Sequence, residues 1–254
     1  MRSTEIQLRR LIRETLLSES PTARAAAAGL ALLAWSRGKT SGVIIYSPDV
    51  LFELIDNLVI DLNGETPDVT EIRKVIRDSL HETCVVRSAV SYASPPSHAP
   101  CWGAEIVQYS VSADDGLSRD GKMGPAAYDA AMWYAHAHSL APDRSLVSTS
   151  AERVWKRYSQ RAEGGDVIEL PFDDLENPKT PEPADDCYVY GPSRQSLDSA
   201  YYLKSKPDGL ASLEQRHSET IEKLYSDYEF DEVELESALH RLAAQLFDSQ
   251  YEES

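Results

Sequence analysis

The sequence predicts an α/β domain with a mixed central sheet and flanking helices, followed by a helical C-terminal segment. Short runs rich in β-branched residues, such as residues 41–46, alternate with segments of helical periodicity, such as residues 50–62. This alternation is typical of a sheet covered by helices. The chain has 254 residues and is 42% hydrophobic, which is enough to bury one substantial core. From residue 210 onward the pattern is helical and charged.

The charge balance excludes one broad class of function. The formal net charge is −17, and residues 163–254 carry 23 Asp/Glu against 7 Lys/Arg. A surface of this sign repels the phosphate backbone, so we expect no nucleic-acid partner.

Cysteine usage and apolar run length indicate where the chain resides. Cys84, Cys101 and Cys187 are an odd and widely spaced set, which favours a reducing compartment over a disulfide framework. The apolar run at residues 25–35 has only eleven residues, too few to span a bilayer. We therefore expect a cytoplasmic protein without a membrane partner.

The chain divides into three predicted regions, which are a basic amphipathic helix within residues 1–20, the α/β domain at 21–205 and an acidic helical segment at 206–254. In the domain we expect helices at residues 22–36, 50–62, 68–80 and 197–202, and strands at 41–46, 85–92, 102–113, 166–170 and 187–190. The final segment should hold helices at 212–228 and 232–250.

The central stretch from Trp102 to Arg161 carries the pattern closest to a functional site. A strand is followed by a polar loop at residues 114–124 and by an Ala-rich helix that opens with Pro125. A connector at 140–148 leads to an amphipathic helix at 149–161. A strand, a glycine-bearing loop and a helix N-terminus in this order form a place to bind an anion, because the first N–H groups and the helix dipole favour negative charge.

This order of elements resembles the core of the GNAT acyltransferase superfamily, of a degenerate tailed-phage type. Gly121-Lys122-Met123-Gly124 stands where the family has its pyrophosphate loop, and Ser148 to Trp155 loosely matches the family's later helix. The resemblance covers residues 85–190. It implies a GNAT-like mixed sheet, acetyl-CoA as the acyl donor and an unknown amine as the acceptor.

The resemblance also implies which residues would bind and react. The backbone of Val111, Ser112 and Ala113 would hold the pantetheine arm of acetyl-CoA. The pyrophosphate would lie against the stretch that contains Gly121, Lys122, Met123, Gly124 and Ala126. An ordinary glycine turn before a Pro-initiated helix explains that stretch equally well.

Two residues are candidates for acid–base work. Glu105, on the strand beside the site, could take the proton of the attacking amine, or it could be a carboxylate on the solvent face of that strand. Trp155 occupies the position where many family members have a tyrosine general acid, so Tyr158, about one turn later, is the substitute candidate. His136 and His138 are two apart and face different directions, so we expect no metal site.

An alternative function uses the same fold without catalysis. The helix at residues 4–18 resembles the basic N-terminal peptides of many tailed-phage proteins, and Ile12-Arg13-Glu14 resembles a prohead-protease site. Under this alternative the chain is a virion or partner-binding protein, and phage structural proteins are its partners. A surface helix packed on its own domain is the simpler reading of residues 4–18.

Overall fold

The computed structural model describes residues 20–37, 40–61, 70, 71, 74, 84–92, 107–113, 123–134, 139–142, 147–171, 196–228, 237 and 240. In these residues the chain forms a mixed α/β fold, which confirms the predicted class. The described helices are α2 (Pro21–Ala27), α3 (Pro48–Asp61), α7 (Gly124–Tyr134), α8 (Thr149–Gly164) and α9 (Leu210–Tyr228). The described strands are β1 (Ala31–Arg37), β2 (Thr40–Tyr46), β3 (Cys84–Tyr92), β4 (Val107–Ala113), β5 (Leu140–Ala141), β6 (Val167–Pro171) and β7 (Ser199–Leu203).

The strands form one sheet in the order β1-β2-β3-β4-β5-β7-β6. The first four strands pair antiparallel with their neighbours, and so do β5, β7 and β6. Between these two groups, β4 and β5 pair parallel through two residue pairs. The sheet is therefore mixed, and its two antiparallel parts meet at one short parallel junction.

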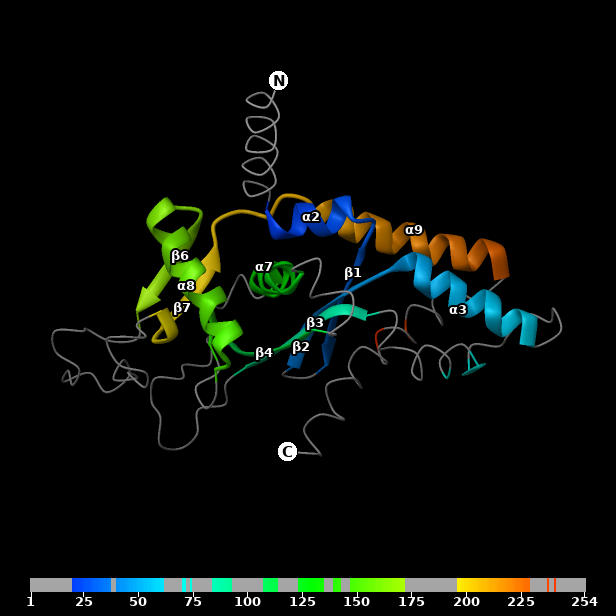
Figure 1. Cartoon of the computed structure of the whole chain (residues 1–254), viewed down its shortest axis with the longest axis horizontal. Coiled ribbons are helices and arrows are strands. Elements are labelled where there is room, and N and C mark those ends of the chain that lie inside the picture. Colours follow the sequence, from blue (N-terminus) through cyan, green and yellow to red (C-terminus); the bar gives the residue numbers. More distant parts are fainter. Residues whose placement is uncertain are drawn as a thin grey trace, which may run out of the picture.

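Helix α7 lies at the centre of the core (Figure 1), with strands on one side of it and α2 and α9 on the other. Seven consecutive residues of α7, from Ala126 to Met132, are buried. A helix that is buried on every side needs small or apolar residues all round. The alanines of α7 meet this need and let the helix lie close to the sheet.

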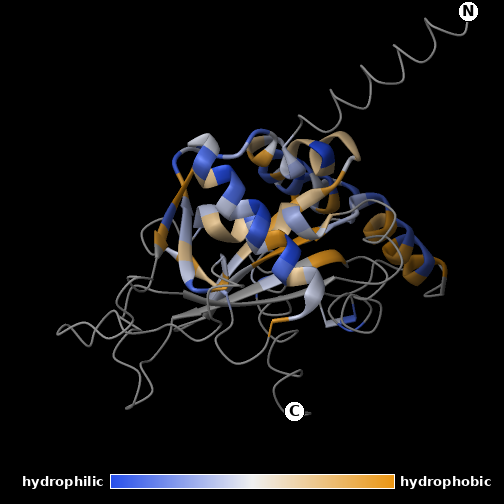
Figure 2. Cartoon of the chain, turned by 60° about the vertical axis from the view of Figure 1, so that its left-hand side comes forward, coloured by the Kyte–Doolittle hydropathy of each residue, from blue (hydrophilic) through white to orange (hydrophobic). Residues whose placement is uncertain are grey.

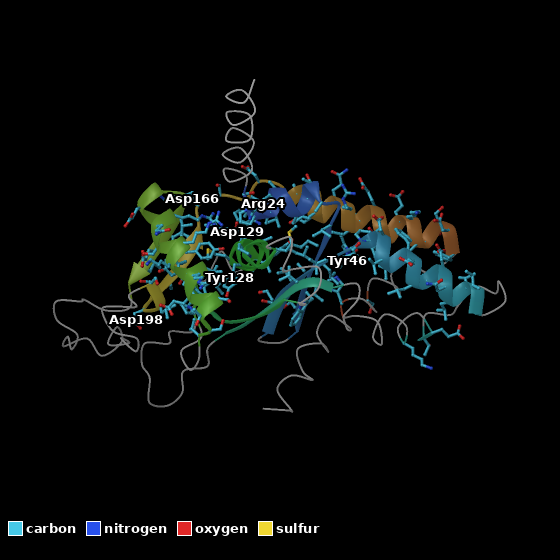
Figure 3. All side chains as sticks on the ribbon, in the orientation of Figure 1. Arg24, Tyr46, Tyr128, Asp129, Asp166 and Asp198 are labelled. Carbon is cyan, nitrogen blue, oxygen red and sulfur yellow. The ribbon has the colours of Figure 1, made fainter. Side chains whose placement is uncertain are left out.

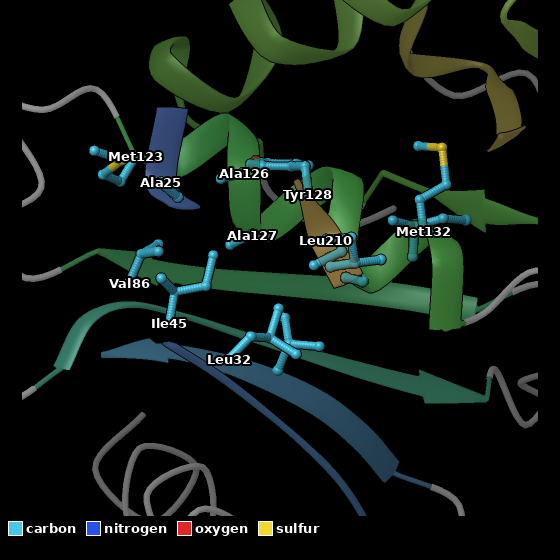
Figure 4. Packing of buried hydrophobic residues seen from close by; sticks show 14 of the residues in the cluster. Ala25, Leu32, Ile45, Val86, Met123, Ala126, Ala127, Tyr128, Met132 and Leu210 are labelled. Atoms are coloured by element: carbon cyan, nitrogen blue, oxygen red, sulfur yellow. The ribbon is translucent and has the colours of Figure 1, made fainter. Parts of the chain in front are cut away.

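The sheet meets α7 through one continuous row of side chains. The register places Leu32 of β1 opposite Ile45 of β2, and Ile45 opposite Val86 of β3. All three residues are buried and point from the sheet toward Ala126 and Ala127 of α7 (Figure 4). Figure 2 shows hydrophobic residues gathered in the interior, and hydrophilic and hydrophobic residues side by side on the surface helices.

Helix α9 begins by packing into this same core. Leu210 and Leu213 are fully buried in the main cluster. The hydroxyls of Ser20 and Thr22, at the start of α2, each donate to the carbonyl of Asp208 at 2.7 Å. The start of the predicted acidic segment at residues 206–254 is thus joined to the beginning of the α/β domain.

Two predicted helices are wrong. The helix expected over residues 22–36 ends at Ala27, and the chain turns through Gly29 (φ 78°) into strand β1. Its alanines favour helix, but the apolar run that follows pairs with β2, and periodicity does not distinguish a short buried strand from a helix. The short helix expected over 197–202 is largely strand β7, where Tyr201 pairs with both β5 and β6.

The other predicted elements that fall on described residues are confirmed with shifted bounds. These are the strands at 41–46, 85–92 and 166–170, the helices at 50–62, 149–161 and 212–228, and the Ala-rich helix that opens with Pro125. Strand 102–113 is described from Val107, and the connector at 140–148 contains β5, which the sequence did not reveal. The elements expected at 4–18, 68–80, 187–190 and 232–250 lie wholly or almost wholly outside the described residues.

None of the helices described here is both long and apolar enough to cross a membrane.

The close approach of β1, β2 and β3 requires glycine at position 42. A Cβ at Gly42 would lie 2.2 Å from the carbonyl oxygen of Ser88 and 2.7 Å from the ring of Trp35. We expect Gly42→Ala to lower the free energy of unfolding by about 1–3 kcal/mol, because the strands must separate to admit the methyl group. Urea denaturation followed by circular dichroism measures this loss.

Gly164→Ala is the matched control, since a Cβ at Gly164 meets nothing within 4 Å. It adds the same methyl group at the last residue of α8, and we expect a gain of up to about 1 kcal/mol from helix propensity. Equal effects of the two substitutions would contradict the close approach at Gly42.

Candidate functional site

The parallel junction between β4 and β5 is the feature of the sheet best suited to receive a ligand. Val107 pairs with Leu140 and Gln108 with Ala141, after which the parallel pairing stops. From Tyr109 to Ala113, strand β4 pairs with β3 but has no strand partner on its β5 side among the described residues. Backbone N–H and C=O groups along such an edge pair with an extended ligand in the way that a strand does.

The predicted pantetheine-binding residues lie in this stretch of β4. Val111, Ser112 and Ala113 are the last three residues of the strand, opposite Ser88, Arg87 and Val86 of β3. The carboxyl ends of parallel strands, where connections lead into helices, are the usual place for ligands in open α/β sheets. Here the connection from β4 leads to α7, and the connection from β5 leads to α8.

The start of α7 holds three of the predicted phosphate-binding residues in different settings. Met123 and Ala126 are buried in the core. The N–H of Ala126 donates to the carbonyl of Met123 at 2.9 Å, and Pro125 has no N–H to offer. Gly124 is partly exposed, and a Cβ built on it meets nothing within 4 Å. Of the three, Gly124 is the position with room for an anion.

Three other predicted residues, Glu105, Gly121 and Lys122, lie outside the described residues.

Helix α8 presents two large aromatic side chains to the core instead of to a ligand. Ser148 caps the helix by accepting a hydrogen bond from the N–H of Ala151 at 3.2 Å. Trp155 and Tyr158 are both buried. The ring of Trp155 stacks on Tyr201 of β7 and meets the edge of Tyr128 of α7. These rings bind α7, α8 and β7 into one unit.

The hydroxyl of Tyr158 is committed to a buried carboxylate. It donates to Asp129 Oδ1 at 2.6 Å, and Arg161 Nη1 donates to the same oxygen at 2.6 Å. The Nε of Arg161 also donates a hydrogen bond to Asp166 Oδ2 at 2.9 Å. We call Asp129, Tyr158, Arg161 and Asp166 the interhelical cluster; Figure 3 shows Asp129 where α7 faces α8.

The electrostatics of the interhelical cluster favour a structural role for Tyr158. Burial and the neighbouring Asp129 carboxylate raise the pKa of Tyr158 well above its ordinary value. Burial alone would lower the pKa of Arg161, but Asp129, Tyr158 and Asp166 together outweigh burial and raise that pKa above its ordinary value. A phenol held in this way keeps its proton, and a guanidinium held in this way keeps its charge.

Sequence reasoning did not single out Asp129 or Arg161. A signal was present, because Asp129 is the only charged residue in the Ala-rich helix and a carboxylate there needs a partner. Tyr158 and Arg161 are three residues apart and therefore lie on one face of α8.

A second buried polar pair lies at the far end of the sheet from α8. Tyr46 of β2 and His217 of α9 share a hydrogen bond between Oη and Nδ1 at 2.8 Å. Burial, and to a smaller extent His240, lowers the pKa of His217 from 6.5 to about 4. The imidazole is therefore neutral at physiological pH.

No group of three or more His, Cys, Asp or Glu side chains is placed to hold a metal ion within the described part of the chain. Comparison of the chain with protein-family models, with curated proteins and with solved structures gave no match.

The neutral state of His217 predicts an acid-sensitive contribution to stability. The folded pKa lies below the unfolded value of 6.5, so the unfolded chain binds the proton more readily. This contribution is therefore complete above pH 6.5 and is lost as the pH falls toward 4. Between pH 7.5 and 5, we expect the wild type to lose about 1–2 kcal/mol more than His217→Gln.

Chemical denaturation of both proteins at the two pH values measures the difference. Tyr46→Phe is the control, because it removes the hydrogen bond but keeps the imidazole buried, and it should retain the wild-type pH dependence. Parallel stability curves for wild type and His217→Gln would show that this imidazole titrates normally.

Proposed function

We propose that this chain is a GNAT-like N-acyltransferase that moves an acetyl group from acetyl-CoA to an amine acceptor. The observation that carries the proposal is the break between β4 and β5, by which we mean that among the described residues β4 has no partner on its β5 side beyond Gln108. Parallel pairing ends after Gln108 and Ala141, and the edge of β4 from Tyr109 to Ala113 faces the break. Such an edge offers backbone groups to the amides of a pantetheine arm.

The order of elements around the break supports the same function. Strand β4 leads through the Gly121–Gly124 loop into α7, and β5 leads into α8, whose N-cap is Ser148. A mixed sheet with a parallel junction followed by two helices agrees with the GNAT-like core that the sequence resembles. In this proposal the diphosphate lies by the first turn of α7, near Gly124 and the Lys122 cation.

The proposed reaction needs few side chains. The amine nitrogen attacks the thioester carbonyl, a base takes the ammonium proton, and the thiolate of CoA leaves. Glu105 is the proposed base, directly or through a water molecule. The pKa of a thiol is about 8.5, so the thiolate is a stable leaving group and the reaction proceeds without a strong acid. Tyr158, whose hydroxyl donates to Asp129, holds α7 against α8 in this scheme.

One observation favours the non-enzymatic alternative. Trp155 stands at the position of the family's proton donor, and both Trp155 and Tyr158 are packed in the core. A chain without an accessible acid at this position could keep the fold and act as a virion or partner-binding protein. Binding of acetyl-CoA separates the two functions, because only the enzyme requires it.

Acetyl-CoA should stabilise the full-length chain against heat. At roughly a hundredfold excess over its Kd, a ligand that binds only the folded state adds about 2.7 kcal/mol to the free energy of unfolding. Differential scanning fluorimetry with acetyl-CoA, free CoA and ATP shows whether the thioester carrier is recognised. No shift in Tm with acetyl-CoA or with CoA would contradict the proposal and favour the virion or partner-binding alternative.

Gly124→Glu tests where the carrier binds. The glutamate has room and stands at a helix N-terminus, where a negative charge is favourable, so the Tm without ligand should hardly change. The new charge repels the diphosphate, and we expect about tenfold weaker binding or worse by calorimetry.

Gly164→Glu is the control, because position 164 is equally open but lies at the opposite end of α8 from its N-terminus. It adds the same net charge and should leave the Kd within about twofold of wild type. Equal weakening by both substitutions would show a general charge effect and not a site at α7.

A further inference from the structure

The two helices that follow β4 and β5 in the chain share one buried carboxylate, in addition to their aromatic contacts. In the chain, α7 lies between β4 and β5, and α8 lies between β5 and β6. Asp129 lies in the middle of α7, and its side chain is 0% exposed. Its Oδ1 accepts from both Tyr158 and Arg161 of α8 at 2.6 Å.

The bonds to Asp129 are directional and charge-assisted. Such bonds are shorter and roughly twice as strong as those between neutral groups. The guanidinium of Arg161 also lies over the ring of Tyr158, 5.0 Å from its centroid. The cation and the phenol therefore approach Asp129 as one packed unit, and a shift of either helix breaks more than one contact.

The aromatic side chain of Tyr128 adds to this link. Its ring lies 5.5 Å from that of Trp155 and 6.3 Å from that of Tyr158, whereas the alanines beside Asp129 pack closely without directional contacts. Arg161 is fixed at its other side by Asp166, at the start of the turn into β6. The link thus runs from α7 through α8 to the beginning of β6.

We infer that Asp129 is a positioning residue, which fixes α7 against α8 and thereby holds the start of α7, where the proposed function places the diphosphate of acetyl-CoA. This inference rests on the proposed function for the ligand, but the fixing of the two helices stands on the contacts alone. Asp129 contacts no reacting atom and acts only through the helix that follows the loop Gly121–Gly124.

Asp129→Asn is the decisive variant. The amide has nearly the shape of the carboxylate and its oxygen still accepts hydrogen bonds, so the chain should fold. The negative charge at Asp129 is lost, and Asp166 is then the one carboxylate among the described residues that still pairs with Arg161. We expect acetyl-CoA to bind at least about tenfold more weakly at a temperature where the variant is fully folded, because small displacements at a binding site have large effects.

Two further proteins make the result specific. Leu224→Ala removes a buried side chain of α9 that lies outside the main core cluster, and it should leave the Kd for acetyl-CoA within about twofold of wild type despite a lower Tm. Arg161→Met removes the cation from the other side and should weaken binding as Asp129→Asn does. The double variant should bind no more weakly than the worse single variant, because both act through one contact.

Hydrogen–deuterium exchange supplies a readout that needs no ligand. In Asp129→Asn the amides of α7 and α8 should lose protection selectively, whereas Leu224→Ala should lose protection chiefly in α9.

The outcomes separate this inference from the proposed function. If the wild type binds acetyl-CoA and Asp129→Asn binds equally well, the positioning role is wrong and the acyl-CoA site stands. If the wild type does not bind acetyl-CoA, the proposed function fails, and the exchange data decide whether Asp129 fixes the two helices. A uniform loss of protection in Asp129→Asn, as in a general loss of stability, would overturn that part as well.

Discussion

The fold depends on neutralising one carboxylate inside its core. Helix α7 is buried on all sides, yet it carries Asp129 with no exposed side-chain surface. An isolated buried carboxylate is far more costly than the stability of a typical domain can offset. The chain meets this requirement with a cation and a hydroxyl from a single face of α8, so the position of α8 follows from the charge on α7.

This constraint also explains why the aromatic side chains lie where they do. Once Tyr158 is directed to Asp129, the indole of Trp155, one turn earlier, meets Tyr128 and stacks on Tyr201. Tyr201 in turn donates to Glu169 of β6, which also accepts from Ser159 of α8. The side of the sheet after the β4–β5 break is therefore held by polar contacts around an aromatic centre. The opposite side is held by the aliphatic row of Leu32, Ile45 and Val86.

The sequence predicted those parts of the fold that local pattern determines. Strands β2 and β3 and helices α3, α8 and α9 have clear periodicity, and the structure confirms them. Prediction from sequence failed where strand pairing overrides helix propensity. Strand β1 follows the Ala-rich helix α2 after a three-residue turn that contains Gly29, and β5 has only two residues. A two-residue strand has no periodicity to detect, although it joins the two antiparallel parts of the sheet. The site was predictable to the same extent: the pattern gave the order of strand, loop and helix, but not Asp129 and Arg161, which meet only in the folded chain.

The burial of Tyr158 changes what the resemblance to acyltransferases can mean. At the sequence level, a tyrosine one turn after Trp155 is a candidate acid; in the structure its proton is held by a carboxylate, and its pKa lies well above the ordinary value. An acid so weak and so enclosed has little tendency to protonate a thiolate. If the chain transfers acetyl groups, catalysis must therefore come from placement of the thioester and from a base, with the leaving group departing as the anion. Rate then depends on how the thioester is placed more than on any one proton donor, and a residue that contributes to this placement from within the core matters as much as one that lines the site.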